Sequence, residues 1–136
     1  MARGAALAAL LLLVAGCVYY PTVVDTGGVR IRTENGRAVR QGSDLLVTFD
    51  VVSTGKYGDT IVGVVSPLAK QAVLVNGTGN ALGRFDIPGA ATVKFTPDGA
   101  HVVLGALQKP IESGQTFIVT LLFEKSGGIG VVTLLE

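Results

Sequence analysis

Two stretches of the chain alternate between apolar and more polar positions with a period of two. In residues 45–52 and 117–124 every second residue is apolar, and in an extended strand these apolar side chains point to the same side. Together with a phenylalanine at position 95, this face predicts the core of the domain. The expected core residues are Phe49, Val51, Phe95, Phe117, Val119, Leu121 and Phe123.

Weaker strand patterns occupy the segments between these stretches. They cover residues 29–33, 60–65, 72–75, 91–96, 102–107 and 129–135. Turn-forming residues separate them at Asn35-Gly36, Gly77 to Asn80, Pro88-Gly89, Pro97 to Gly99, Ser113-Gly114 and Gly127-Gly128. Since no segment keeps a helical period, the pattern predicts an all-β domain, an antiparallel sandwich or barrel of about 7–9 short strands.

The first residues follow a different pattern. Arg3 precedes an apolar run from Ala5 to Ala15, which is shorter than the roughly 20 residues of a membrane-spanning helix. The run ends in Val14-Ala15-Gly16-Cys17, which resembles the lipobox cleaved by bacterial lipoprotein signal peptidase. We therefore expect residues 1–16 to be a signal peptide and Cys17 to be the lipidated residue. The alternative is a core helix that happens to end in a cysteine.

Residues 17–28 show no sustained apolar period and contain Pro21 and Gly27-Gly28, so we interpret them as a tether. At about 3.3 Å per residue this tether reaches no more than roughly 40 Å. The domain of residues 29–136 would then be held by membrane lipid at the extracytoplasmic face of the cell membrane, in the periplasm or at the cell surface. Lipidation would also use the single cysteine and leave none for a disulfide, a nucleophile or a metal.

Charge gives no indication of a nucleic-acid partner. Outside the signal segment the basic and acidic residues balance at 10 each, because Arg3 is the one basic residue removed from a total of 11. The densest basic group is Arg30, Arg32, Arg37 and Arg40. Glu34 and Asp44 partly offset these charges, so we expect a solvated strand edge.

The motifs of common enzymes are absent from the sequence. No serine lies in a G-x-S-x-G elbow, no H-E-x-x-H motif occurs, and one histidine would have to serve any catalytic role alone. Gly77, Gly79 and Gly83 approach a dinucleotide fingerprint, but the third glycine is one place late, which favours a hairpin loop. Asp59 and Asp98 lie beside glycine or in a turn motif and are interpreted as turn formers. We do not expect an enzyme, and a hydrolase without a recognisable motif remains an alternative.

Several segments together resemble the periplasmic copper chaperones of the PCu(A)C type. They run from Asp59-Thr60 to Ser66-Pro67-Leu68-Ala69, and from Thr96 to Leu104 through Pro97-Asp98-Gly99-Ala100-His101; Leu107, Pro110, Gly114 and residues 117–124 add to them. The resemblance covers roughly residues 29–136. It implies a cupredoxin-like β-sandwich, and in that family the domain carries Cu(I) toward cytochrome oxidase.

The copper ligands of that family are mostly missing here. The family pattern has two histidines and two methionines, with the second pair as H-x-M on one strand, where alternate side chains point to the same side. The corresponding pair is His101 and Val103, the other histidine falls near Asn76, and the only methionine is Met1. His101 is therefore a metal-ligand candidate, and the alternative is a local hydrogen bond after Asp98-Gly99. We expect no cofactor. Copper is the one alternative that the resemblance leaves open.

These observations leave three functions open. The first is a membrane-anchored domain of the copper-chaperone type that has lost most copper ligands and binds a protein or another component of the cell envelope. The second is a chaperone that delivers Cu(I) to an envelope cuproenzyme such as cytochrome oxidase, through His101 with Asn76 or a ligand from the partner. The third is the hydrolase.

Overall fold

The computed structural model describes residues 28–136, and these form nine strands without a helix. The strands are β1 (Ile31–Gln41), β2 (Asp44–Ser53), β3 (Asp59–Val65), β4 (Ala69–Val75), β5 (Phe85–Ile87), β6 (Ala91–Phe95), β7 (His101–Leu107), β8 (Thr116–Phe123) and β9 (Gly127–Leu135). The all-β prediction is confirmed. Within residues 28–136 no helix is long and apolar enough to cross a membrane.

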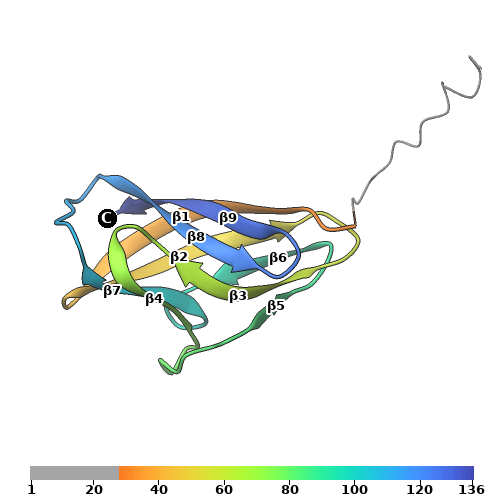
Figure 1. Cartoon of the computed structure of the whole chain (residues 1–136), viewed down its shortest axis with the longest axis horizontal. Helices are drawn as coiled ribbons and strands as arrows, with labels where there is room; N and C mark the ends of the chain where they lie inside the picture. The colour runs from red at the N-terminus through yellow and green to blue at the C-terminus, as the bar shows by residue number, and fades with distance from the viewer. Residues whose placement is uncertain (1–27) are drawn as a thin grey trace, which may run out of the picture.

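The strands form one curled sheet in the order β4-β7-β2-β1-β9-β8-β3-β5, and β6 pairs with the part of β2 that β7 leaves free. Figure 1 shows the sheet folded around its own interior, with β8 and β9 on one side and β2 and β6 on the other. All pairs are antiparallel except β1 with β9, which run parallel. That pair joins the first and last strands.

The core lies where the alternating faces of β2 and β8 meet. Six of the seven expected core residues are buried, and Phe117 is half-buried at the margin. Phe49 and Phe95 are register partners on β2 and β6, and their rings stack with centroids 4.5 Å apart. The period-two pattern therefore placed the correct face inward.

The predicted turn at Asn35-Gly36 is wrong, because β1 continues through it to Gln41. A β-bulge between Glu34 and Arg37 takes up these residues. Asn35 has a positive φ of 56° and donates a hydrogen bond to the Asp50 carboxylate at 2.9 Å. A side chain at Gly36 would meet the Val132 carbonyl oxygen of β9 at 2.3 Å, so the glycine permits a close strand contact.

One short strand and one strand boundary also differ from the prediction. β5 is a three-residue strand, too short to produce a detectable period in the sequence. The last hairpin turns at residues 124–126, so Gly127 and Gly128 belong to β9. The turns at Gly77 to Asn80, Pro88-Gly89, Pro97 to Gly99 and Ser113-Gly114 are confirmed.

Candidate functional site

His101 is the first residue of β7 and lies on the outer face of the sheet. Val102 and Leu104 are fully buried in the core, so strand alternation turns His101 and Val103 to the opposite side. Despite that direction, His101 is only 7% exposed. The candidate ligand is thus a buried side chain outside the main core.

The imidazole of His101 makes the local hydrogen bond considered from the sequence. Its Nδ1 lies 3.0 Å from the carbonyl oxygen of Gly99, two residues earlier. Because a carbonyl oxygen can only accept, Nδ1 is the donor, which leaves Nε2 as the ring nitrogen available to a metal. The turn that presents this carbonyl is closed by bonds from Gly99 N to Thr96 and from Thr96 N to Ala100.

Asn76 lies next to His101 in the fold, but its side chain makes hydrogen bonds within its own loop. Val75 is the register partner of His101 on β4, and Asn76 follows it directly. The Asn76 Oδ1 atom accepts hydrogen bonds from Thr78 N at 3.0 Å, Thr78 Oγ1 at 2.7 Å and Asn80 N at 3.0 Å. Its oxygen is therefore used to shape the loop that follows β4.

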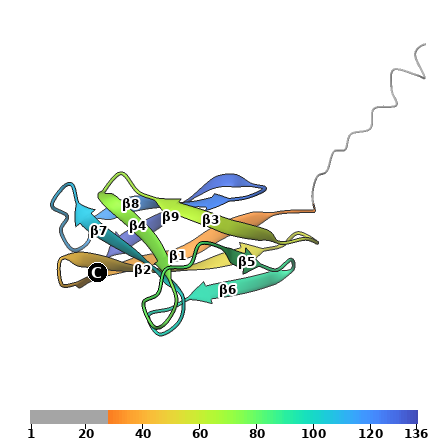
Figure 2. The same ribbon diagram turned by 60° about the horizontal axis from the view of Figure 1, so that its bottom comes forward.

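The loop after β4 packs against the loop before β7. A side chain at Gly77 would come within 2.4 Å of the Asp98 carbonyl oxygen, so the two backbones are in close contact. Figure 2 shows these loops together at the lower edge of the molecule. Gly77, Gly79 and Gly83 all lie in this β4–β5 connection. β4 and β5 are not paired with each other, but an antiparallel bridge between Val75 and Ala81 closes a local turn that contains Gly77 and Gly79.

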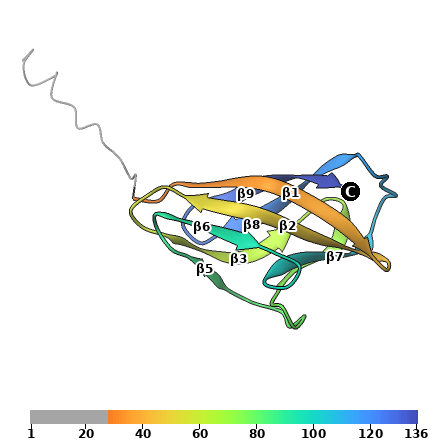
Figure 3. The ribbon, with the colours of Figure 1, turned by 180° about the vertical axis from the view of Figure 1, so that it is seen from behind.

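Val103, at the second position of the H-x-M pattern, lies in an apolar row across four strands. The register pairs Val39 of β1 with Leu46 of β2, Leu46 with Val103, and Val103 with Val73 of β4. Leu46 is buried, while Val39 and Val73 at the two ends of the row are exposed. Figure 3 shows β1, β2 and β7 on the face that carries this row. A valine has no donor atom for a metal.

The residues present do not fit a copper site of the expected kind. Among residues 28–136 no three His, Cys, Asp or Glu side chains come together as a metal-binding group, and the one methionine of the sequence, Met1, precedes this range. The residues that the structure brings together are His101, bonded to Gly99, an apolar Val103, and Asn76 with its oxygen engaged. Soft Cu(I) favours several converging thioether, thiolate or imidazole donors.

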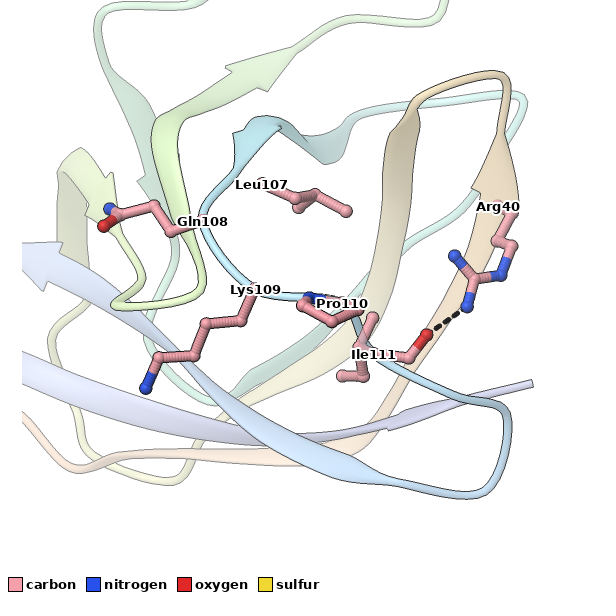
Figure 4. Close-up of a pocket in the computed structure, with 6 residues that line it drawn as sticks. All are labelled: Arg40, Leu107, Gln108, Lys109, Pro110 and Ile111. Carbon is pink, nitrogen blue, oxygen red and sulfur yellow. Dashed lines mark hydrogen bonds between the residues drawn. The ribbon is translucent and has the colours of Figure 1, made fainter.

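The four arginines lie just before and along β1 and are exposed, but the expected strand edge is wrong, because β1 pairs with both β2 and β9. Arg32 pairs with Glu34 at 2.9 Å and Arg37 with Glu136 at 2.6 Å. Arg40 donates to the Ile111 carbonyl across a shallow hollow of about 390 Å³, which Leu107, Gln108, Lys109 and Pro110 complete (Figure 4). Its guanidinium thus holds the β7–β8 loop onto the end of β1. Within residues 28–136, Glu136 forms an ion pair with one of these arginines and Asp44 does not.

Asp59 is more than the turn former expected from the sequence. It is buried at the start of β3 and its carboxylate accepts bonds from Thr60 N, Lys125 N, Ser126 N and Ser126 Oγ at 2.7–2.9 Å. Burial raises its pKa, but the bonds from Ser126, Lys125 and Thr60 outweigh this and hold the pKa below the usual 3.8. Because Lys125 and Ser126 are 66 and 67 residues away, no local motif could have revealed this role.

Cys17 and the predicted signal peptide lie outside the described residues. Comparison with known proteins bears on them indirectly. The family model described as "Putative lipoprotein LpqE-like" matches residues 26–133. The chain belongs to the LpqE-like family. A relative from Leifsonia xyli subsp. xyli (strain CTCB07), named "Putative lipoprotein Lxx21020", is 32% identical over 134 residues, with 89% of this chain and 81% of that protein covered.

Solved structures similar to this LpqE-like chain are PCuAC domains. The copper-bound PCuAC domain from PmoF2 has a TM-score of 0.69 at 22% identity and covers 78% of this chain and 92% of that one. The Cu(I) form of DR1885 from Deinococcus radiodurans has a TM-score of 0.60 at 22% identity and covers 90% and 83%. The resemblance stated from the sequence is thereby confirmed for the fold, which is cupredoxin-like. The names of these proteins describe lipoproteins and copper-binding domains rather than enzymes.

Proposed function

We propose that this protein is a lipid-anchored component of the extracytoplasmic membrane surface whose PCuAC-type domain serves as a binding module and does not hold Cu(I) tightly. The anchor is Cys17, supported by the lipobox-like sequence and by the lipoprotein family to which the chain belongs. Its partners would be membrane lipid through Cys17 and a protein of the cell envelope.

The loss of copper donors carries this proposal. His101 alone offers an imidazole nitrogen, Val103 has no donor, and the Asn76 oxygen already accepts three hydrogen bonds. One imidazole does not reproduce the several soft donors that retain Cu(I). Fold similarity at 22% identity leaves function to be decided by the site.

Copper delivery is the second candidate, and one contact favours it. Metal-ligating histidines almost always donate their other ring N–H to a carbonyl or carboxylate, as His101 Nδ1 does to Gly99. The Nε2 atom would then be the copper ligand, and further donors would come from a partner protein. In this case the domain would bind copper weakly by itself and more tightly with that partner.

Competition with a high-affinity Cu(I) chelator under reducing conditions separates the two candidates. We expect the unmodified domain and a His101→Ala variant to lose copper alike. A Val103→Met and Asn76→His double variant should retain more copper, because it restores two donor types beside His101. Stoichiometric copper that resists the chelator and is abolished by His101→Ala would overturn the proposal and favour the chaperone.

A further inference from the structure

The described chain begins at one end of the molecule, where three loops meet. They are residues 54–58 between β2 and β3, residues 88–90 between β5 and β6, and residues 124–126 between β8 and β9. Figures 1 and 3 show them at the end of the sheet opposite to the C-terminus. We call this end, together with Gly28 and Arg30, the tip.

The first described residue is fixed to the tip. Tyr57 N donates to the Gly28 carbonyl at 2.6 Å, Val29 forms a parallel bridge with Tyr57, and Thr54 N donates to the Arg30 carbonyl. The β5–β6 loop is attached by a bond from Ala90 N to the Gly55 carbonyl at 2.9 Å. A chain that leaves at Gly28 toward Cys17 therefore leaves from a loop cluster with defined positions.

Exposed cations and an exposed aromatic side chain occupy the tip. Lys56, Lys125 and Arg30 are exposed, and Tyr57 is 56% exposed with the Lys56 Nζ atom 5.4 Å from its ring centre. Of the nearby carboxylates, Asp59 is buried among N–H donors and Glu124 pairs with Arg84, whereas Asp86 is exposed and accepts a bond from the neutral Thr60 hydroxyl. The three exposed cations of the tip therefore outnumber its one exposed carboxylate without an ion pair among the described residues.

The opposite end has a different composition. Glu136 pairs there with Arg37, and Glu112, Lys109 and Arg40 are exposed, so charges of both signs are mixed. Among residues 28–136 the one tyrosine, Tyr57, lies at the tip, where the described chain also begins.

We propose that the tip is a membrane-contact surface that binds anionic phospholipid headgroups of the bilayer in which the anchor is inserted. The lysines and Arg30 face the negative headgroups, and the Tyr57 ring lies at the level where amphipathic aromatic side chains collect. The inference depends on the proposed anchor. A tether of 11 residues, 17–27, cannot exceed about 40 Å, so even weak contacts are favoured by a high local concentration of lipid.

The sequence has no tryptophan, so a Tyr57→Trp variant gives a single fluorescent reporter at the tip. The acylated mature chain, which begins at Cys17, is incorporated into vesicles of phosphatidylcholine with or without phosphatidylglycerol, some containing lipids brominated near the headgroup. Gln108→Trp is the matched control, because Gln108 is exposed and directly follows β7 at the opposite end. We expect quenching of the Tyr57→Trp variant in phosphatidylglycerol vesicles, less at high salt, and little quenching of the control.

Charge removal tests the contribution of the lysines. Each lysine near an anionic surface contributes about a fivefold factor in affinity, so Lys56→Gln with Lys125→Gln should lower the ratio of tip-bound to free orientations about 25-fold. Lys109→Gln makes the same charge change at the far end and should leave quenching unaltered.

Flotation of the vesicles reports on the anchor separately. A chain that does not float overturns the anchor and this inference with it. A chain that floats but shows equal quenching at both ends, or no effect of the two lysines, overturns the membrane-contact surface alone and favours a protein partner at the tip.

Discussion

At the scale of single residues, the carboxylate of Asp59 joins the start of β3 to the β8–β9 turn. Asp59 accepts bonds from residues 60, 125 and 126, and two of these donors are backbone N–H groups of the distant turn. Hydrogen bonds to a charged group contribute more than neutral ones. Asp59 therefore stabilises the tertiary arrangement of the tip as well as its own turn.

Replacement of this carboxylate should be costly although the shape changes little. In an Asp59→Asn variant the amide nitrogen cannot accept the bonds that the second oxygen receives from Ser126. We expect a loss of about 1.5–3 kcal/mol in the free energy of unfolding, measured by urea denaturation at pH 7. Asp98→Asn, at an exposed turn position, is the control and should change stability by less than about 0.5 kcal/mol. Equal losses in the two variants would contradict the assignment.

The same residue predicts a pH dependence of stability. The pKa of Asp59 is lower in the folded chain than its usual 3.8, so its stabilisation is fully present above about pH 3.8 and is lost as the pH falls through the folded value. The Asp59→Asn variant lacks this titration. The difference in unfolding free energy between parent and variant should shrink as denaturation is repeated from pH 7 down to pH 2. A difference that stays constant over that range would refute the linkage.

At the scale of elements, the sequence pattern predicted strands better than the connections between them. The alternation at residues 45–52 and 117–124 reports burial directly, and both strands are where it placed them. Asn35-Gly36 has the composition of a hairpin turn, but what decides its structure is contact with β9, far along the chain. Local propensity could not reveal that contact, so β1 was predicted eight residues too short at its C-terminal end.

The two phenylalanines at the ends of β8 test the packing of that strand. Phe123 is buried in the core and Phe117 is half-buried at its margin. Phe123→Ala should cost about 3–5 kcal/mol of unfolding free energy, and Phe117→Ala less, because a partly solvated ring leaves a smaller cavity. Chemical denaturation measures both. Losses well under 1 kcal/mol for both variants would exclude the assigned core face.

At the scale of the whole molecule, the fold and the site were predictable to different degrees. Turn spacing and strand period indicate a β-sandwich, and the hydrogen bond between His101 and Gly99 was one of the two alternatives foreseen. The row through Val103 and the close packing of Gly77 on Asp98 depend on strand register between distant segments. No periodicity within one strand contains that information.

At the scale of the whole molecule, the proposed membrane attachment depends on one residue, Cys17. Two or more acyl chains bind a protein stably, whereas a few surface cations alone bind a membrane only weakly. Detergent phase partitioning of Cys17→Ser against the parent measures this: the parent should enter the detergent phase and the variant should be released into the aqueous phase. An Asn76→Ser variant, which leaves the lipobox intact, is the control and should partition with the parent. If Cys17→Ser remains as membrane-bound as the parent, the lipid anchor is wrong, and the domain must reach the membrane through another part of the chain.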